Sequence, residues 1–192
     1  MAEEVMEDFG PSSGRITGVL GVAICVGIVV LGVAESARGF PPAAVWAALF
    51  GGVLFWAALL RPRVRVTESE LRLRNMVSTV SVPLAAIEQI VVRQVLSVRA
   101  GEDRYVSSAI GKTWRQLLKS GSEREPGANA PYPDFVEERL HKLAEDARIR
   151  EGIDLMSDGQ LERARAVSRE WAWPEIVLLG FTALGFVVAL LV

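Results

Sequence analysis

Three long stretches of the chain carry almost no charge, whereas the rest of the chain is rich in charged residues. The stretches cover residues 16–35, 40–60 and 174–192. The hydrocarbon core of a bilayer is ~30 Å thick, and a helix rising ~1.5 Å per residue crosses it in about 20 residues. A helix of a water-soluble protein would carry polar residues at helical spacing, and these stretches do not. The pattern therefore predicts three transmembrane helices.

The first stretch could instead be a cleaved signal peptide, because Ala34-Glu35-Ser36 loosely resembles a cleavage site. Signal peptides begin with positive charge. Here four acidic residues between positions 3 and 8 precede a single base, Arg15. We therefore expect a retained span that follows an acidic cytoplasmic tail, residues 1–15.

The third stretch has a recognisable start. Pro174 suits the first turn of a helix, where its missing N–H is not needed, and Glu175 complements the positive end of the helix dipole. Trp171 and Trp173 precede it and suit a membrane–water boundary. These residues favour a helix that begins close to position 174.

Basic residues flank two of the predicted spans. Loops rich in Lys and Arg stay in the cytoplasm, whereas acidic residues have little influence on orientation. We therefore expect a multi-pass protein of the cell membrane, with the N-terminus and residues 61–172 in the cytoplasm and the C-terminus outside. The flanking bases are Arg61, Arg63, Arg65, Arg72 and Arg74 after the second span and Arg163, Arg165 and Arg169 before the third.

After the second span the pattern changes from helical to alternating. Residues 63–66 and 71–74 alternate polar and apolar positions around a polar turn at 67–70, which is typical of a β-hairpin. With that turn, Arg65 lies opposite Arg72 and Arg63 lies opposite Arg74. Further strands are predicted at about 76–82, 88–93, 95–99 and 104–110, followed by a short helix at 112–119.

Five or six antiparallel strands and one helix predict a small β-barrel or curled sheet capped by the helix, so the fold class is membrane α plus β. The segments that carry this pattern are RVRVTESELRLRN, VPLAAIEQIVV and RYVSSAIGKTWRQLL. They resemble bacterial pleckstrin-homology-like (PH-like) domains, which occur in small membrane proteins of high-GC Gram-positive bacteria. The resemblance covers residues 61–119 and implies a PH-like cytoplasmic domain that follows a pair of spans.

The stretch between this domain and the third span has a different character. Residues 120–133 are rich in Gly, Pro, Ser and Ala and predict a linker. Two cytoplasmic helices are expected within 134–172, the first from Asp134 to about Ile149 and the second from about Ser157 to Ala172. The apolar stripe of the first is Val136, Leu140, Leu143 and Ala147.

Charge is separated along the cytoplasmic part of the chain. Residues 61–119 hold eleven basic and five acidic residues, and residues 120–170 hold eight basic and twelve acidic ones. Both segments could be ordinary solvated surface, or the acidic helices could dock on the basic sheet.

The hairpin arginines Arg63, Arg65, Arg72 and Arg74 form the most informative cluster, because alternation places them on one face. Like charges opposite one another in a sheet repel, so an anionic partner is favoured, and lipid headgroups are the candidate. The alternative is that these arginines only set the orientation. Phosphoinositide binding is not expected, since the loop at 67–70 is acidic where lipid-binding relatives are basic.

Small residues recur at four-residue spacing in the second span, which lets helices approach closely. We expect them to pack the second span against the first, with a homodimer as the alternative. They are Ala43, Ala44, Ala47, Ala48, Gly51 and Gly52.

The chain has no recognisable catalytic constellation. It contains no Gly-rich phosphate loop, no Ser nucleophile motif and no metal-ligand spacing. Its single cysteine, Cys25, lies within the first span, and its single histidine, His141, falls off the apolar stripe and is expected to be solvated. We therefore expect no enzyme, no cofactor, no metal site and no nucleic-acid partner.

The sequence favours a membrane-tethered binding or scaffolding protein that presents a basic β domain at the inner leaflet to a protein or anionic-lipid partner. The alternative is an accessory subunit of a membrane complex that recognises a membrane-protein partner through its spans.

Overall fold

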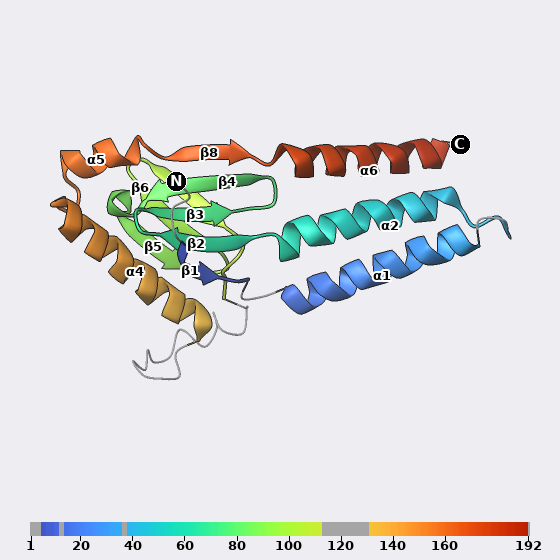
Figure 1. Ribbon diagram of the computed structural model, residues 1–192, viewed down its shortest axis with the longest axis horizontal. Helices are drawn as coiled ribbons and strands as arrows, with labels where there is room; N and C mark the ends of the chain where they lie inside the picture. Colours follow the sequence, from blue (N-terminus) through green and yellow to red (C-terminus); the bar gives the residue numbers. More distant parts are fainter. Residues whose placement is uncertain (1–4, 12–13, 36–37, 113–130, 192) are drawn as a thin grey trace. The chain divides into compact units, whose positions relative to one another are not determined.

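The computed structural model describes residues 5–11, 14–35, 38–112 and 131–191 (Figure 1). They form two compact units. The helical unit comprises the described parts of 14–61 and 171–192, and the β unit comprises the described parts of 1–13 and 62–170. Each unit has its own interior, so the two are described separately.

The helical unit contains the three predicted hydrophobic helices. They are α1 (Arg15–Ala34), α2 (Pro42–Phe55), which continues as the π-helical η2 (Trp56–Leu60), and α6 (Trp173–Leu191). Their mean hydropathies are 2.7, 2.1 and 2.2, and each is long and apolar enough to cross a membrane. The prediction of three such helices from the charge-free stretches is confirmed.

Close contacts between α1 and the second span are made at glycines. An added Cβ on Gly18 would lie 2.9 Å from Leu59, and one on Gly21 would lie 2.8 Å from the Phe55 ring. From the other side, a Cβ at Gly52 would lie 3.2 Å from Cys25 of α1. Within the helical unit, α2 and η2 therefore lie against α1 at these positions.

Other positions of the predicted small-residue ladder are less closely packed. Gly51 is within ordinary contact of Cys25, and Ala48 is buried. Ala43, Ala44 and Ala47 are half-buried.

The α2–α6 contact uses an aromatic residue and a glycine. The Trp46 ring lies edge-on to Phe181 with ring centroids 5.7 Å apart. A Cβ on Gly185 would lie 2.3 Å from the same indole, so only glycine fits there. The second span is therefore packed against both of its neighbours.

A charged pair joins the ends of two of these helices. Arg61 follows η2 directly, and its Nε donates to Oε1 of Glu175, in the first turn of α6, over 2.8 Å. The two side chains are only 4% and 14% exposed. Glu175 thus lies at the positive end of the helix dipole, as predicted from its position, and it also binds a buried guanidinium.

We expect either single substitution, Arg61→Met or Glu175→Gln, to destabilise the helical unit by about 3–5 kcal/mol, because each removes one member of a buried, directly hydrogen-bonded charge pair. The double variant with Met at both positions should lose less stability than the sum of the singles. Thermal unfolding of the full chain in detergent micelles checks this, and strictly additive losses would contradict it.

The β unit contains two antiparallel sheets and no closed barrel among its described residues. The first sheet has the order β1-β2-β3-β4-β8 and the second the order β5-β6-β7. The strands are β1 (Val5–Phe9), β2 (Arg63–Thr67), β3 (Glu70–Arg74), β4 (Ser78–Pro83), β5 (Gln89–Val92), β6 (Leu96–Ala100), β7 (Asp103–Ser107) and β8 (Ser168–Trp171). Of the two predicted alternatives, a barrel or a curled sheet, the closed barrel is therefore corrected, since the described strands form two separate sheets.

The predicted hairpin is present in its predicted register. Arg63 pairs with Arg74, and Arg65 pairs with Arg72. The alternate residues of the same strands, Val64, Val66, Leu71 and Leu73, have no exposed surface and belong to the core of the β unit. Alternation along β2 and β3 thus separates an apolar inner face from a basic outer face.

Two predictions about the segments at the ends of the β unit were wrong. The acidic tail is not a free tail, because Val5–Phe9 forms β1 and pairs with β2, with Phe9 buried in the core. The second helix does not extend to position 172. It is the short α5 (Asp158–Ala164), and the following residues form β8 beside β4. The predicted helix at 112–119 and most of the linker at 120–133 lie outside the described residues.

The first helix of the β unit, α4 (Tyr132–Glu151), docks through its apolar stripe as predicted. Val136, Leu140, Leu143 and Ala147 are all buried in the core of the β unit. Two of its side chains bind backbone groups of the sheet region, since Glu137 accepts from the N–H of Val92 and Arg148 donates to the Ile87 carbonyl. Apolar burial, with a few polar contacts around it, therefore attaches this helix.

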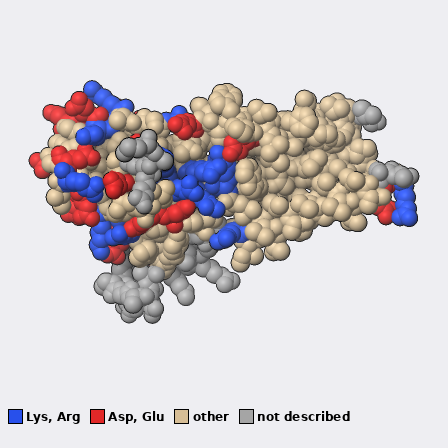
Figure 2. Space-filling view, in the orientation of Figure 1, with Lys and Arg blue, Asp and Glu red and all other residues tan. Residues whose placement is uncertain are grey.

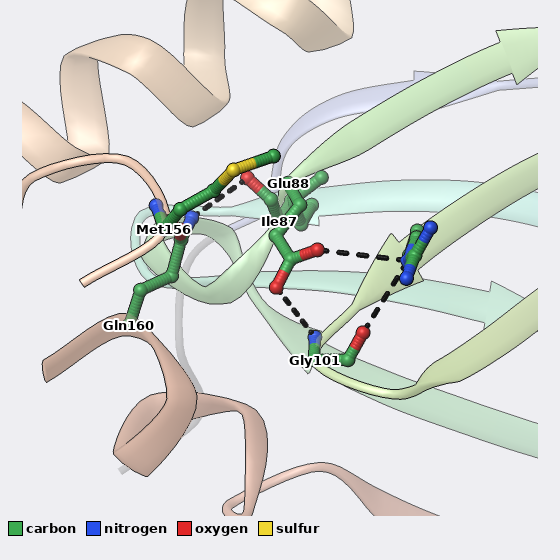
Figure 3. Close-up of polar contacts among 6 residues, drawn as sticks. Ile87, Glu88, Gly101, Met156 and Gln160 are labelled. Carbon is green, nitrogen blue, oxygen red and sulfur yellow. Dashed lines mark hydrogen bonds and ion pairs between the residues drawn. The ribbon is translucent and has the colours of Figure 1, made fainter. Parts of the chain in front are cut away.

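A fully buried amide holds α5 in place (Figure 3). The Gln160 Nε2 donates to the carbonyls of Ala85 and Ile87 over 3.2 and 3.1 Å, and its Oε1 accepts from the N–H of Met156 over 2.6 Å. Met156 has a positive φ of 60°, which its hydrogen bond helps to maintain. Beside it, Glu88 accepts from the backbone N–H of Gly101 and faces Arg99.

We expect Gln160→Ala to destabilise the β unit by about 1–3 kcal/mol, because it removes the buried amide's hydrogen bonds to Ala85, Ile87 and Met156. Glu162→Ala, on the exposed side of the same helix, is the matched control and should change little. The unfolding midpoint of the full chain in detergent checks this, and equal midpoints for the two variants would contradict it.

Candidate functional site

The outer face of β2 and β3 carries the four predicted arginines. Arg63, Arg65 and Arg72 have 47%, 39% and 44% of their side chains exposed, and Arg74 is half-buried. Figure 2 shows the Lys and Arg atoms as a blue area in the region of these two strands. The structure therefore brings all four together, as the alternation indicated. We call these four residues the basic face.

An acidic residue that sequence analysis did not connect with this cluster lies on its edge. Asp8 of β1 pairs with Arg65 in the sheet register. Its Oδ2 lies 3.1 Å from Nε of Arg65 and 3.8 Å from Nη1 of Arg63. Two guanidinium groups thus approach one carboxylate oxygen. On the neighbouring strand, Oε2 of Glu70 lies 3.3 Å from Nε of Arg72.

The other side of β1 faces α4. Oε1 of Glu7 accepts from Nε of Arg139 over 2.8 Å, and this hydrogen bond and the carboxylate charge raise the pKa of Arg139. The hydroxyl of Tyr132 lies 3.4 Å from the Gly10 carbonyl that follows β1. Burial raises the pKa of Tyr132, and the charge of Asp8 adds to the effect. The acidic strand is therefore held by charged and polar groups on both sides.

A shallow hollow of about 490 Å³ lies beside these groups, lined by Glu7, Phe135, Glu138, Arg139 and Lys142. Its charges are paired with one another, since Glu7 faces Arg139 and Glu138 faces Lys142 over 2.8 Å. The hydrogen bond from Lys142, with its charge, lowers the pKa of the Glu138 carboxyl. The hollow is thus lined by exposed ion pairs and one aromatic ring.

No group of three or more His, Cys, Asp or Glu side chains that could hold a metal ion occurs within the described residues. His141 is exposed, as expected, but its Nε2 also lies 2.9 Å from the Ile90 carbonyl. Cys25 is buried in the helical unit. Among the described residues, the arginines of the basic face form the cluster of like-charged side chains that alternation along the sequence predicted.

Comparisons with protein-family models, with curated proteins and with solved structures each find no match.

The raised pKa of Tyr132 predicts a loss of stability at high pH. Folding favours the neutral phenol, so its stabilising contribution is complete below pH ~10 and disappears as pH rises through the higher folded-state pKa. We expect the unfolding midpoint to fall above pH ~10 and to fall less steeply in Tyr132→Phe. Burial also raises the pKa of Tyr105, so this residue should account for part of the remaining pH dependence of the midpoint. Identical pH profiles for the variant and the unsubstituted chain would contradict this.

Proposed function

We propose that this protein is a three-span membrane protein that holds a PH-like β unit at the cytoplasmic leaflet, where the basic face binds anionic lipid headgroups. The role is binding and tethering rather than catalysis. The observation that carries the proposal is the register of β2 and β3, which sets Arg63 opposite Arg74 and Arg65 opposite Arg72 on one solvent-facing surface.

Repulsion between the paired arginines of β2 and β3 makes their placement on one face unfavourable unless anions lie close to them. Like charges directly opposite one another on a sheet are destabilising, and Asp8 and Glu70 lie beside Arg65 and Arg72 at the edge and turn of this face. Near an anionic leaflet each basic side chain gains about 1 kcal/mol, within a Debye length of ~8 Å at physiological ionic strength. An anionic surface would therefore relieve the repulsion among the four arginines.

The chain connection supports contact with the leaflet. The second hydrophobic helix ends with η2 at Leu60, and β2 begins at Arg63, so only two residues intervene. An extended residue spans at most ~3.6 Å, which keeps the start of β2 close to the end of that helix. The first arginine of the basic face is thereby tethered near the membrane boundary.

The pairing of β1 with β2 supports the proposed topology. The two strands form one sheet, although α1 and α2 lie between them in the sequence. Both strands must therefore be on the same side of the membrane, which requires an even number of crossings between them. Two crossings, by α1 and α2, satisfy this condition, and α6 then leads to the other side. The arginines that flank α2 and α6 favour the cytoplasm for the β unit.

The strand arrangement supports the PH-like interpretation. Strands β2 to β4 form one antiparallel meander and β5 to β7 form another, in separate sheets that share one core. A meander of this kind and a curled sheet are what the resemblance of residues 61–119 implies. The acidic β2–β3 turn, with Glu68 and Glu70, argues for general anion binding in place of phosphoinositide recognition.

Substitution of the basic face tests the proposal. We expect the full chain with Arg63, Arg65, Arg72 and Arg74 all changed to Gln to retain at least about tenfold less phosphatidylglycerol than the unsubstituted chain in mixed detergent micelles. The reason is the loss of about 1 kcal/mol per arginine. Bound lipid can be counted by native mass spectrometry, with phosphatidylcholine as the neutral reference.

The matched control changes four exposed arginines elsewhere in the β unit to Gln, namely Arg93, Arg99, Arg163 and Arg165. It alters the net charge equally and should leave phosphatidylglycerol retention close to that of the unsubstituted chain. Equal losses in both variants would show that net charge alone attracts the lipid. No loss in either would show that the basic face only sets the orientation.

A further inference from the structure

Strand β1 places its two acidic side chains on basic groups of two different elements. Asp8 reaches Arg65 and Arg63 of β2, and Glu7 reaches Arg139 of α4. In Figure 1, β1 is the edge strand beside β2. The strand therefore occupies part of the surface that an anionic headgroup would use.

The attachment of β1 is weak in several respects. Its register against β2 is irregular between Val5 and Glu7. Val5 and Met6 are 46% and 55% exposed, so they bury little apolar surface, and Phe9 is the strand's buried anchor. The ion pairs of Asp8 and Glu7 are exposed, and exposed pairs contribute little and weaken with salt. An edge strand held in this way can detach at modest cost.

We propose that β1 is a displaceable occupant of the basic face, and that anionic headgroups compete with Asp8 for Arg63 and Arg65. This inference rests on the headgroup-binding function proposed above and adds its regulation. With β1 in place, the carboxylate of Asp8 stands where a headgroup phosphate oxygen would be bound. When a headgroup takes the two guanidinium groups, Asp8 loses its partners and the pairing of β1 with β2 weakens.

Competition of this kind is reciprocal. If docking of β1 lowers the affinity for headgroups by a given factor, headgroup binding lowers the equilibrium constant for β1 docking by the same factor. Substitutions in β1 should therefore change lipid binding, and a change of lipid should change the protection of β1. A strand that serves only to complete the sheet would show neither effect.

The first experiment measures β1 directly. The full chain is placed in nanodiscs of phosphatidylglycerol or of phosphatidylcholine, and hydrogen exchange is followed at the amides of Val5–Phe9. We expect faster exchange of these amides in phosphatidylglycerol, with unchanged exchange in the core strands β3 and β6. Equal exchange of β1 in the two lipids would overturn the proposal.

The second experiment uses Asp8→Asn, which removes the competing charge and keeps the side chain's shape. We expect it to raise phosphatidylglycerol retention about two- to five-fold, the range that corresponds to an exposed ion pair. Glu68→Gln is the matched control, because it removes one exposed acid from the β2–β3 turn, and it should have a smaller effect. An Asp8→Asn effect no larger than that of the control would contradict the proposal.

A third variant releases β1 without changing any charge. Phe9→Ala removes the buried anchor of the strand and should also raise phosphatidylglycerol retention, provided that hydrogen exchange in the core strands shows that the β unit is still folded.

The failure of one proposal can be told apart from the failure of the other. If the quadruple arginine variant loses lipid but β1 exchange and the β1 variants have no effect, headgroup binding stands and strand displacement fails. If the quadruple variant retains lipid fully, the proposed function itself fails.

Discussion

The exclusion of charge from hydrocarbon is the constraint on which the rest of this structure depends. A charged side chain at the centre of a bilayer is costly, and unpaired backbone groups there are costly too, so the hydrophobic stretches form helices and carry no charge in their interiors. The charged residues are consequently concentrated in the β unit and at the helix ends. The pair of Arg61 and Glu175 follows the same rule, because each buried charge has a partner 2.8 Å away.

The pairing of β1 with β2 joins the segment before α1 to the segment after α2 and η2. It brings a segment that precedes α1 into the same sheet as a segment that follows α2. One strand thereby supplies Phe9 to the core and Asp8 to the basic face. The same five residues thus contribute to the core and to the charge beside Arg63 and Arg65. An anion that approaches these two arginines therefore meets the carboxylate of Asp8 whenever β1 is paired with β2.

Much of the fold could be predicted because its signals are local. Uninterrupted apolar residues predicted the hydrophobic helices, and strict alternation predicted the register of Arg63 with Arg74 and of Arg65 with Arg72. The stripe of Val136, Leu140 and Leu143 predicted the buried side of α4. In each case the residues that carry the pattern lie within one element or one hairpin.

The features that were missed depend on partners far away in the sequence. The segment at Val5–Phe9 is short and acidic, and only its pairing with β2, after two intervening helices, makes it a strand. The residues of β8 were predicted to be helical because nothing local indicates that they pair with β4. The buried amide of Gln160 has three backbone partners, two of which lie more than seventy residues away. Alternation in the sequence identified the four arginines of the basic face. It gave no sign that Asp8 lies beside two of them.

Labelling of single cysteines tests the membrane topology most directly. In a Cys25→Ser background, one cysteine replaces Ser69 in the β2–β3 turn, and in a separate variant one replaces Arg38 in the link between α1 and α2. Intact cells are then treated with a membrane-impermeant maleimide. With the β unit in the cytoplasm, we predict labelling at position 38 in intact cells, and labelling at position 69 only after the membrane is opened. Labelling of position 69 from outside intact cells would contradict it.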